Sequence, residues 1–215
     1  MSNMVPSGWV LHIFRDVVES KVLGTTRRGV GKTNIILIKM GNLLKGNIVF
    51  NKTELIEHAS DIESLILKDG DFLFNTRNTP ELVGKVSVFR QSNIKATFDN
   101  NLMRLRFIGS VDSFYMGQLF NLGENLFTLK KIVSGTTSVA AIYWNDLSRL
   151  RFSLPPLPEQ QKIATILTSV DDAIEKTEAQ INKLQDLKKG MMQELLTKGV
   201  GTNGVPHSEF KGSPV

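Results

Sequence analysis

A run of prolines, Leu154-Pro155-Pro156-Leu157-Pro158, interrupts this chain. Proline lacks a backbone N–H and restricts the residue before it, so neither a strand nor a helix can continue through the run. Pro158 is nevertheless suited to open a following helix, because the first helical N–H has no partner to lose. The run predicts a boundary between a domain of residues 1–157 and a helix that begins at 158.

A heptad pattern follows this boundary and runs from 167 to 195 without slippage. A helix from 158 to 198 would be about 60 Å long, which exceeds the diameter of a domain of this size. A helix lying on its own domain would therefore leave part of its apolar seam in water. The pattern favours pairing with a helix of another chain, and polar residues within the seam would fix register and orientation. The predicted interface consists of Ile163, Leu167, Val170, Ile174, Thr177, Ile181, Leu184, Lys188, Met191 and Leu195.

The first 157 residues show short apolar or alternating runs separated by clusters of Gly, Asn, Asp and Lys. In residues 102–108, Met103, Leu105 and Phe107 share one face while Arg104 and Arg106 share the other, which predicts a half-buried strand. The fold class predicted is α+β, a β-rich domain followed by a single long helix. The predicted strands are 35–38, 72–74, 83–89, 102–108 and 139–144, and the predicted short helices are 53–60 and 111–122.

Charge is distributed unevenly along the chain. Residues 1–157 contain 19 Lys and Arg against 13 Asp and Glu, a balance of +6, whereas residues 158–215 contain 7 against 8, a balance of −1. The basic excess favours a polyanionic partner for the domain. With no cysteine and only three scattered histidines, His12, His58 and His207, no disulfide or metal site is expected. The absence of a signal peptide or an apolar span predicts a soluble, cytoplasmic protein.

No catalytic motif is complete. The segment Gly29-Val30-Gly31-Lys32-Thr33 suggests a phosphate-binding loop, but that motif needs glycine where Thr26 stands, and a strand before it rather than after it. The stretch Leu154-Pro155-Pro156-Leu157 lacks both ends of the Asn/Asp-Pro-Pro-aromatic loop of an adenine methyltransferase. We therefore expect no catalytic residues, and we interpret residues 27–32 as a basic loop suited to phosphates or to solvent.

The stretch LPPLPEQQKIATILTSVDDAIEKTEAQINKLQDLKKGMMQELLTKGV (154–200) resembles the helix that follows each target-recognition domain in the specificity subunits of type I restriction–modification enzymes. The resemblance to this family extends over nearly the whole chain. Four further segments resemble parts of such a domain: VPSGW (5–9), IKMGNLLKGNIVF (38–50), GDFLFNTRNTPELVGKVSVF (70–89) and SGTTSVAAIYWNDLSRLRFSLPP (134–156).

The resemblance implies a non-catalytic reader of double-stranded DNA whose two domains are held apart by two helices in an antiparallel coiled coil. Methyltransferase subunits would methylate adenine with S-adenosylmethionine, and restriction subunits would use ATP and Mg²⁺, so this chain itself needs no cofactor. One domain and one helix are present here, and HSEFKGSPV (207–215), part of an expected flexible tail from 199, resembles the segment before a second VP-x-GW opening. A natural half-subunit, a truncated product and an engineered fragment remain alternatives.

We expect two copies to pair through residues 160–198 and to read an inverted repeat. The alternative is a coiled-coil scaffold or adaptor that binds only protein. In the DNA-reading interpretation, cations meet phosphates while Arg and Asn side chains meet base edges. Each candidate also has a plain reading as a turn residue or a solvated charge. The candidates are Arg27, Arg28 and Lys32 in the basic loop, Arg77 and Asn78 in an NTRN turn, and Lys130, Lys131, Thr136 and Thr137 around an SGTT turn.

Overall fold

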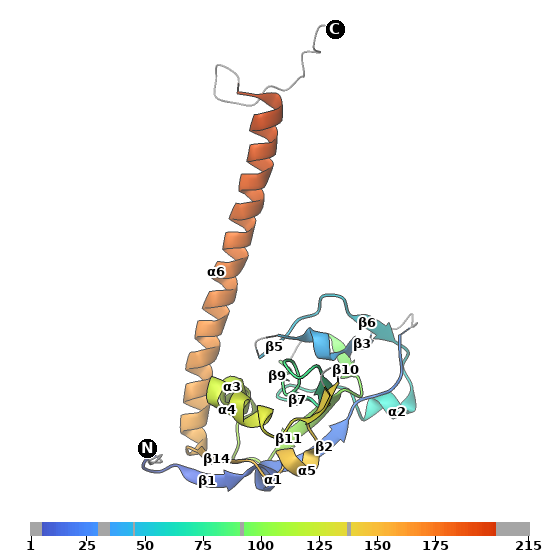
Figure 1. Ribbon diagram of the computed structural model, residues 1–215, viewed down its shortest axis with the longest axis vertical. Coiled ribbons are helices and arrows are strands. Elements are labelled where there is room, and N and C mark those ends of the chain that lie inside the picture. Colours follow the sequence, from blue (N-terminus) through green and yellow to red (C-terminus); the bar gives the residue numbers. More distant parts are fainter. Residues whose placement is uncertain (1–5, 30–34, 45, 91–92, 137–138, 201–215) are drawn as a thin grey trace. The chain divides into compact units, whose positions relative to one another are not determined.

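The computed structural model describes residues 6–29, 35–44, 46–90, 93–136 and 139–200 (Figure 1). Packing divides the chain into two units, Met1–Thr165 and Ile166–Val215. The first is a domain rich in short strands, and the second contains most of one long helix. A mixed, sheet-rich domain followed by a long helix is the α+β class that the sequence predicts, and this prediction is confirmed.

The centre of the domain is an antiparallel sheet of four strands in the order β2-β11-β7-β9. Side chains alternate between its faces, so Phe72, Phe74 and Leu105 enter one apolar cluster while Leu73 and Leu102 enter a second. The sheet is therefore covered on both faces. Its strands are β2 (Val18–Leu23), β11 (Leu102–Phe107), β7 (Phe72–Asn75) and β9 (Val86–Val88).

Four smaller sheets surround this centre. Strand β10 (Lys95–Phe98) pairs in parallel with β3 (Ile35–Ile38), which pairs with β6 (Glu54–Ile56). Strand β12 (Ser134–Gly135) pairs with β13 (Ala140–Ala141), which pairs with β8 (Arg77–Asn78). A short hairpin joins β4 (Leu43–Leu44) to β5 (Asn47–Ile48), and β1 (Val10–Ile13) pairs with β14 (Arg151–Leu154). The last pairing places the first and last strands of the domain side by side.

Helix α3 covers the first face of the sheet. Its N-cap is Asp112, whose Oδ1 accepts a hydrogen bond of 2.8 Å from the Tyr115 N–H. Gly117 allows close packing, because a Cβ there would press on the Val88 side chain of β9. The helices are α1 (Phe14–Val17), the 3₁₀ turn η1 (Met40–Asn42), α2 (Ser60–Glu63), α3 (Ser113–Asn121), α4 (Gly123–Lys130), α5 (Trp144–Leu147) and α6 (Leu157–Lys198).

The long helix α6 begins inside the domain. The Gln160 side chain is 1% exposed: its Oε1 accepts from the Asp112 N–H at 2.9 Å, and its Nε2 donates to Pro155 O at 2.8 Å and Ser110 O at 3.1 Å. Ala164 is buried in the first cluster, and Ile163 packs partly against it. The packed unit thus extends to Thr165, beyond the proline boundary. Ile163, assigned to the helix seam by the heptad pattern, has its contacts with its own domain.

Several elements lie where the sequence predicts them, including β3, β7, β11, α3 and the extent of α6. The helix predicted at 53–60 is wrong: Glu54–Ile56 form strand β6, because pairing with β3 overrides the local pattern, and α2 begins only at Ser60. The strand predicted at 139–144 is reduced to Ala140–Ala141, since Trp144 already opens α5. Among the described residues, no helix combines the length and apolarity needed to cross a membrane.

The second face of β11 is also buried, which contradicts the prediction of a half-buried strand. Arg104 is only 7% exposed, so the strand is not half-buried. Its guanidinium donates to the carbonyls of Ser64 and Ile66 at 3.2 and 3.4 Å, and burial lowers the pKa of this group. Asp71, itself 2% exposed, lies 3.8 Å from Arg104.

Asp71 also binds the second arginine of β11. Its oxygens accept from Arg106 at 2.6 and 3.1 Å, and this hydrogen bonding raises the pKa of Arg106. The Asp71 Oδ2 atom also accepts a hydrogen bond from the Lys68 N–H at 2.8 Å. One carboxylate therefore balances both arginines and closes the turn before β7.

We predict that Asp71→Asn lowers the free energy of unfolding by about 3 kcal/mol, because it leaves two arginines without their carboxylate partner. Urea unfolding followed by circular dichroism measures the change. The control is Asp69→Asn, which removes the charge of an exposed carboxylate nearby and should change stability by less than about 1 kcal/mol. Equal effects of the two substitutions would contradict this role for Asp71.

Candidate nucleic-acid interface

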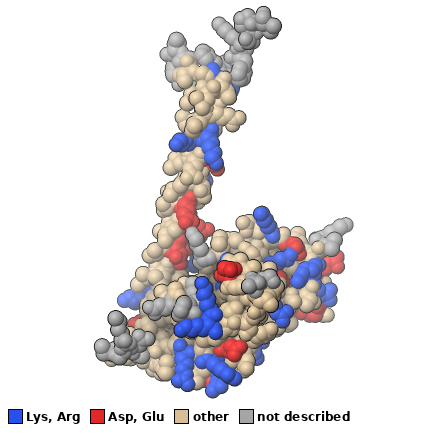
Figure 2. Space-filling model, in the orientation of Figure 1, with Lys and Arg blue, Asp and Glu red and all other residues tan. Residues whose placement is uncertain are grey.

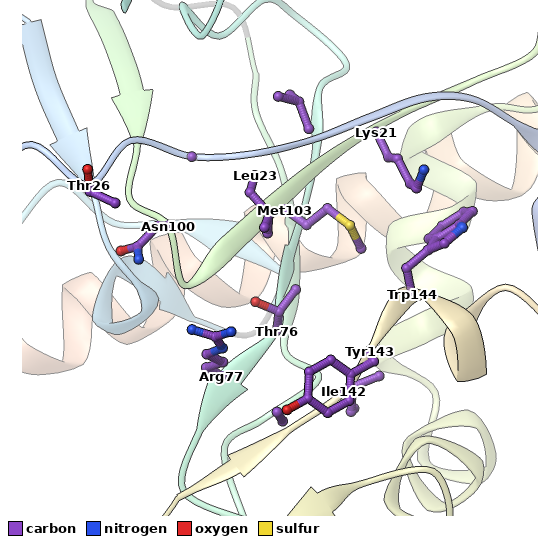
Figure 3. Close-up of a pocket in the computed structure, with 13 residues that line it drawn as sticks. Lys21, Leu23, Thr26, Thr76, Arg77, Asn100, Met103, Ile142, Tyr143 and Trp144 are labelled. Atoms are coloured by element: carbon purple, nitrogen blue, oxygen red, sulfur yellow. The ribbon is translucent and has the colours of Figure 1, made fainter.

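A pocket of about 550 Å³ lies at one end of the central sheet (Figure 3). Lys21 and Leu23 of β2 and Met103 of β11 line it, together with Thr76 and Arg77 from the end of β7 and from β8. Asn100, Thr26 and the segment from Ala141 to Trp144 complete it. The pocket therefore joins four stretches that lie far apart in the sequence, 21–26, 76–77, 100–103 and 141–144.

The pocket has an apolar interior and a basic, polar rim. Leu23, Met103 and Ile142 supply much of the apolar wall, and Figure 3 shows Thr26 and Asn100 on one side with Lys21 and Trp144 on the other. The Lys21 ammonium lies 5.0 Å from the centroid of the Trp144 ring, within cation–π range. The lining includes two cations, Lys21 and Arg77, and no carboxylate. Its charge suits an anionic ligand.

Arg77 is the candidate that the fold leaves most available. It is exposed, and among the described residues its side chain has no hydrogen bond or ion pair. The sequence placed Arg77 and Asn78 in a turn, which is wrong: they form β8 and pair with Ala141 and Ala140. This pairing directs Arg77 to the pocket, while Asn78 Oδ1 accepts from the Thr79 N–H at 2.9 Å.

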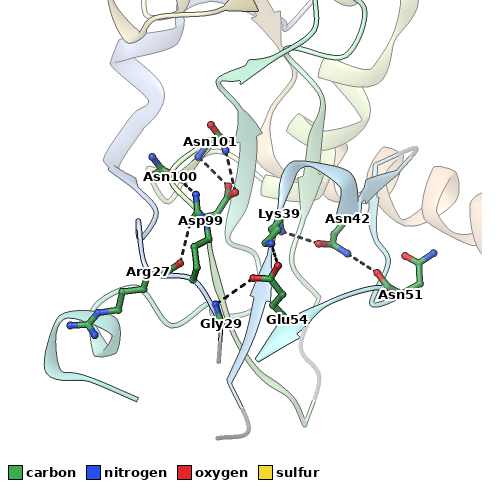
Figure 4. A network of polar contacts seen from close by, with 10 residues as sticks. Arg27, Gly29, Lys39, Asn42, Asn51, Glu54, Asp99, Asn100 and Asn101 are labelled. Carbon is green, nitrogen blue, oxygen red and sulfur yellow. Dashed lines mark hydrogen bonds and ion pairs between the residues drawn. The ribbon is translucent and has the colours of Figure 1, made fainter. Parts of the chain in front are cut away.

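We define the basic loop as residues 24–29, which include the described part of the predicted loop 27–32. Polar contacts to Asp61, Asn100 and Glu54 hold it, and Figure 4 shows the contact between Gly29 and Glu54. Arg28 donates to Asn100 Oδ1 at 3.1 Å, and the Gly29 N–H donates to Glu54 at 3.4 Å. Arg27 donates to Asp61 at 2.9 Å, and this hydrogen bond lowers the pKa of the Asp61 carboxyl. Arg28 thus stands beside the pocket, whereas the charge of Arg27 is already paired.

A turn at residues 99–101 positions Asn100. Asp99 is 3% exposed, and its carboxylate accepts from the Asn101 N–H at 3.0 Å and from Asn101 Nδ2 at 3.2 Å. The Asn100 N–H donates to Thr25 O at 3.0 Å, which ties the turn to the basic loop. Gly24 is required where these segments meet, because a Cβ there would collide with the carbonyl oxygens of Phe98 and Asp99.

The remaining candidates lie outside the pocket lining. Gly135 has a φ of 136°, and a Cβ there would collide with Val139 O, so the β12–β13 hairpin itself requires glycine. Thr136 is exposed in that hairpin, and its N–H donates to Val139 O at 2.8 Å. Lys130 ends α4 and Lys131 caps it. Lys32 and Thr137 lie outside the described residues.

Lys130 nevertheless contributes to the electrostatics around Glu81. The pKa of the Glu81 carboxyl is lowered first by a hydrogen bond from its own backbone N–H, then by the Thr79 side chain and the Lys130 charge. Figure 2 shows Lys and Arg side chains spread over the visible face of the domain, with fewer acidic ones among them.

Sequence reasoning missed Lys21, Asn100, Tyr143 and Trp144, which the fold brings to Arg77. A local signal existed for the aromatic pair, because Tyr143 and Trp144 directly follow the apolar run Ala140–Ile142. In the structure that run is buried, whereas Tyr143 is 53% exposed. Asn75, the last residue of β7, is fully buried. Neither polar atom of its side chain has a hydrogen-bond partner among the described residues.

Comparison with known proteins gives one consistent result. Residues 8–186 match the family model described as type I restriction modification DNA specificity domain. The putative type I restriction enzyme MjaX specificity subunit of Methanocaldococcus jannaschii is 29% identical over 98% of this chain and 50% of its own length. The MjaVIII specificity subunit of the same organism is 32% identical over 75% of this chain and 33% of its own length.

The fold also has a solved counterpart. The HsdS subunit from Thermoanaerobacter tengcongensis superimposes with a TM-score of 0.55 at 19% identity, covering 93% of this chain and 47% of that one. This is a likeness of fold. The chain spans half or less of the length of these relatives.

We predict that Gly24→Ala lowers the free energy of unfolding by about 1–3 kcal/mol, because the added methyl group must displace backbone that cannot rotate away. Thermal or urea unfolding measures this effect. Gly41→Ala is the matched control, since a Cβ at Gly41 meets nothing within 4 Å, and it should shift stability by less than about 1 kcal/mol. A neutral Gly24→Ala would show that the junction of the basic loop and the 99–101 turn is not tightly packed.

Proposed function

This chain belongs to the type I restriction modification DNA specificity family, and we propose that its domain binds duplex DNA at the pocket and reads one short sequence element. The observation that carries this proposal is the basic pocket, whose lining includes Lys21 and Arg77 and no carboxylate, with Arg77 exposed at its rim and without an ion pair to any described residue. We define the pocket face as the lining of this pocket together with Arg28, which hydrogen-bonds to Asn100.

The chemistry of the pocket face matches both parts of DNA recognition. Lys21 and Arg28 suit phosphates, whose contacts supply affinity and orientation. Arg77 can bond two acceptors of guanine, and Asn100 can bond adenine in the same two-point manner. In this proposal methyltransferase and restriction subunits act on the DNA that the chain selects. S-adenosylmethionine, ATP and Mg²⁺ then belong to those subunits.

We expect Arg77→Ala to weaken binding to a random-sequence duplex pool and to reduce the salt dependence of that binding. If Arg77 contacts a phosphate, the slope of log affinity against log salt should fall by about one unit; if it reads a base, selectivity should relax by roughly 1–3 kcal/mol. Fluorescence anisotropy between about 50 and 200 mM salt measures the first effect. Sequencing of the pool that stays bound measures the second.

The matched control for this charge removal is Lys95→Ala. Lys95 is exposed at the start of β10, at the other end of that strand from the turn that holds Asn100. Its removal should leave both the slope and the selected sequences unchanged. Absence of any salt-dependent DNA binding in the intact chain, even with modification subunits added, would favour the alternative of a protein-binding coiled-coil scaffold.

We further propose that the helix pairs with a second copy of itself. From Leu167 to Met191 the apolar seam residues are 40–65% exposed. Such a stripe is stable in water only when another apolar surface buries it. The exposed members are Leu167, Val170, Ile174, Ile181, Leu184 and Met191.

The charges of the helix favour an antiparallel pair. Residues 166–178 carry four acidic side chains and one basic, a net charge of −3, whereas residues 179–198 carry four basic and two acidic, a net charge of +2. Figure 2 shows acidic side chains on one stretch of the helix and basic ones on another. A parallel pair would place like charges together, while an antiparallel pair brings each acidic half to a basic half.

Pairing about the midpoint near residue 179 defines the register. In an antiparallel pair the a residues of one helix face the d residues of the other. Ile174 then faces Leu184 of the second copy, and Thr177 faces Ile181. Lys188 faces Val170, which brings its ammonium into the acidic half of the second helix. The two domains are related by a two-fold axis and would read an inverted repeat.

We predict that Ile174→Asp/Ile181→Asp converts a dimer to a monomer in light scattering, because two carboxylates enter the seam. The control Ala179→Asp/Asn182→Asp adds two carboxylates to the same turns, outside the heptad seam, and should leave the dimer intact. A monomeric intact chain would assign the seam to a different helix and remove the inverted-repeat expectation.

Cysteine cross-linking tests the orientation of the pair. The chain contains no cysteine, so introduced thiols are unambiguous. Antiparallel pairing predicts a covalent dimer for Ile174→Cys/Leu184→Cys and none for either single variant, because only the double variant brings two thiols into one layer. Efficient cross-linking of Ile174→Cys alone would indicate a parallel pair.

A further inference from the structure

The pocket has a larger volume than the reading of paired DNA requires. Base edges in a duplex lie at the floor of a groove, where they are reached by protruding side chains, helices or ribbons. A recess of about 550 Å³ would remain unfilled against such a surface. Its volume falls in the range of roughly 300–1,000 Å³ that encloses small molecules. The recess suits a group that projects from the DNA.

We propose that the pocket receives one unstacked nucleotide of the bound DNA strand. The inference rests on the proposed DNA-reading function and assigns a ligand to the centre of that site. The base lies against Tyr143 and Trp144, above the apolar wall that Leu23 and Met103 provide, and its phosphate lies at Arg77 on the rim.

The side chains supply each contact that an unstacked nucleotide needs. Every base has a π-face that stacks on aromatic rings, and Tyr143 is an aromatic residue that is 53% exposed. Trp144 is half-buried against Phe14, with ring centroids 6.0 Å apart, so its ring is held in place. Across the pocket, Asn100 and Thr26 offer donors and acceptors to the base edge (Figure 3).

The charge of the site selects a nucleotide within a strand over a neutral aromatic ligand. No carboxylate lines the pocket to repel phosphate, and Lys21 and Arg77 stand on its rim. Arg28, held by Asn100, extends the positive charge beyond the pocket, where the neighbouring phosphates of a strand would lie. A free mononucleotide would leave this further cation unused.

The test uses Trp144 as the reporter. The chain has two tryptophans, so Trp9→Phe leaves Trp144 as the sole one. The probes are a short paired duplex, the same duplex with one bulged adenine, and deoxyadenosine monophosphate. Unstacking costs free energy that a bulged base has already lost. We expect the bulged duplex to bind roughly tenfold more tightly than the paired one, because stacking of one base on an aromatic ring contributes about that much affinity. We also expect the bulged duplex to quench Trp144 fluorescence.

Two variants separate the pocket from the fold. Tyr143→Ala should bring the ratio of the affinities for the bulged and the paired duplex to about one, whereas Tyr143→Phe should retain the preference for the bulged duplex. In the Trp144→Phe protein the remaining Trp9, which hydrogen-bonds to Glu159 outside the pocket, should show no quenching.

Three outcomes would overturn the inference. Equal affinity for the two duplexes without quenching would leave DNA reading intact but remove the nucleotide from the pocket. Quenching by deoxyadenosine monophosphate and not by the bulged duplex would assign the pocket to a free nucleotide. Absence of binding to every duplex would remove the proposed function together with this inference.

Discussion

The buried carboxylate of Asp71 is the interaction on which the domain depends. It balances Arg104 and Arg106, which β11 directs away from the first apolar cluster. Without that balance the second face of the sheet would have to remain in water, because unpaired charges are costly to bury. With it, a second cluster covers that face and β11 becomes a central strand. The end of this rigid sheet is where the pocket lies.

A pocket at the end of a sheet can collect side chains from many segments without moving any of them. Leu23 and Met103 reach it from adjacent strands in register, and Arg77 reaches it because β8 pairs with β13. The basic loop and the 99–101 turn fix the polar rim through Asn100. A site held by strands and short turns is pre-organised, so little conformational entropy is lost when a ligand binds.

We propose different roles for the domain and the helix: the domain reads DNA and the helix pairs with a second copy. Strands β1 and β14 pair, so the chain enters and leaves the domain at neighbouring positions, and Gln160 anchors the first turns of α6 there. Beyond Thr165 the helix carries an exposed seam and opposite charges in its two halves. In this proposal, DNA reading resides in the domain and pairing in the helix.

Local periodicity was sufficient to predict much of this chain. The proline run, the heptads of α6 and the alternation in β7 and β11 depend on neighbours in sequence, and the helix and strands lie where these patterns indicate. The family resemblance also rests on such segments, and it led to the correct fold class. Arg77, Asn100 and Trp144 belong to three separate segments that share no sequence motif, so no single segment could predict the pocket. The tertiary structure determined the pocket, because strands distant in sequence pair there. It also determined the ion pair of Arg27 with Asp61 and the burial of Arg104, because each brings together residues that are distant in sequence.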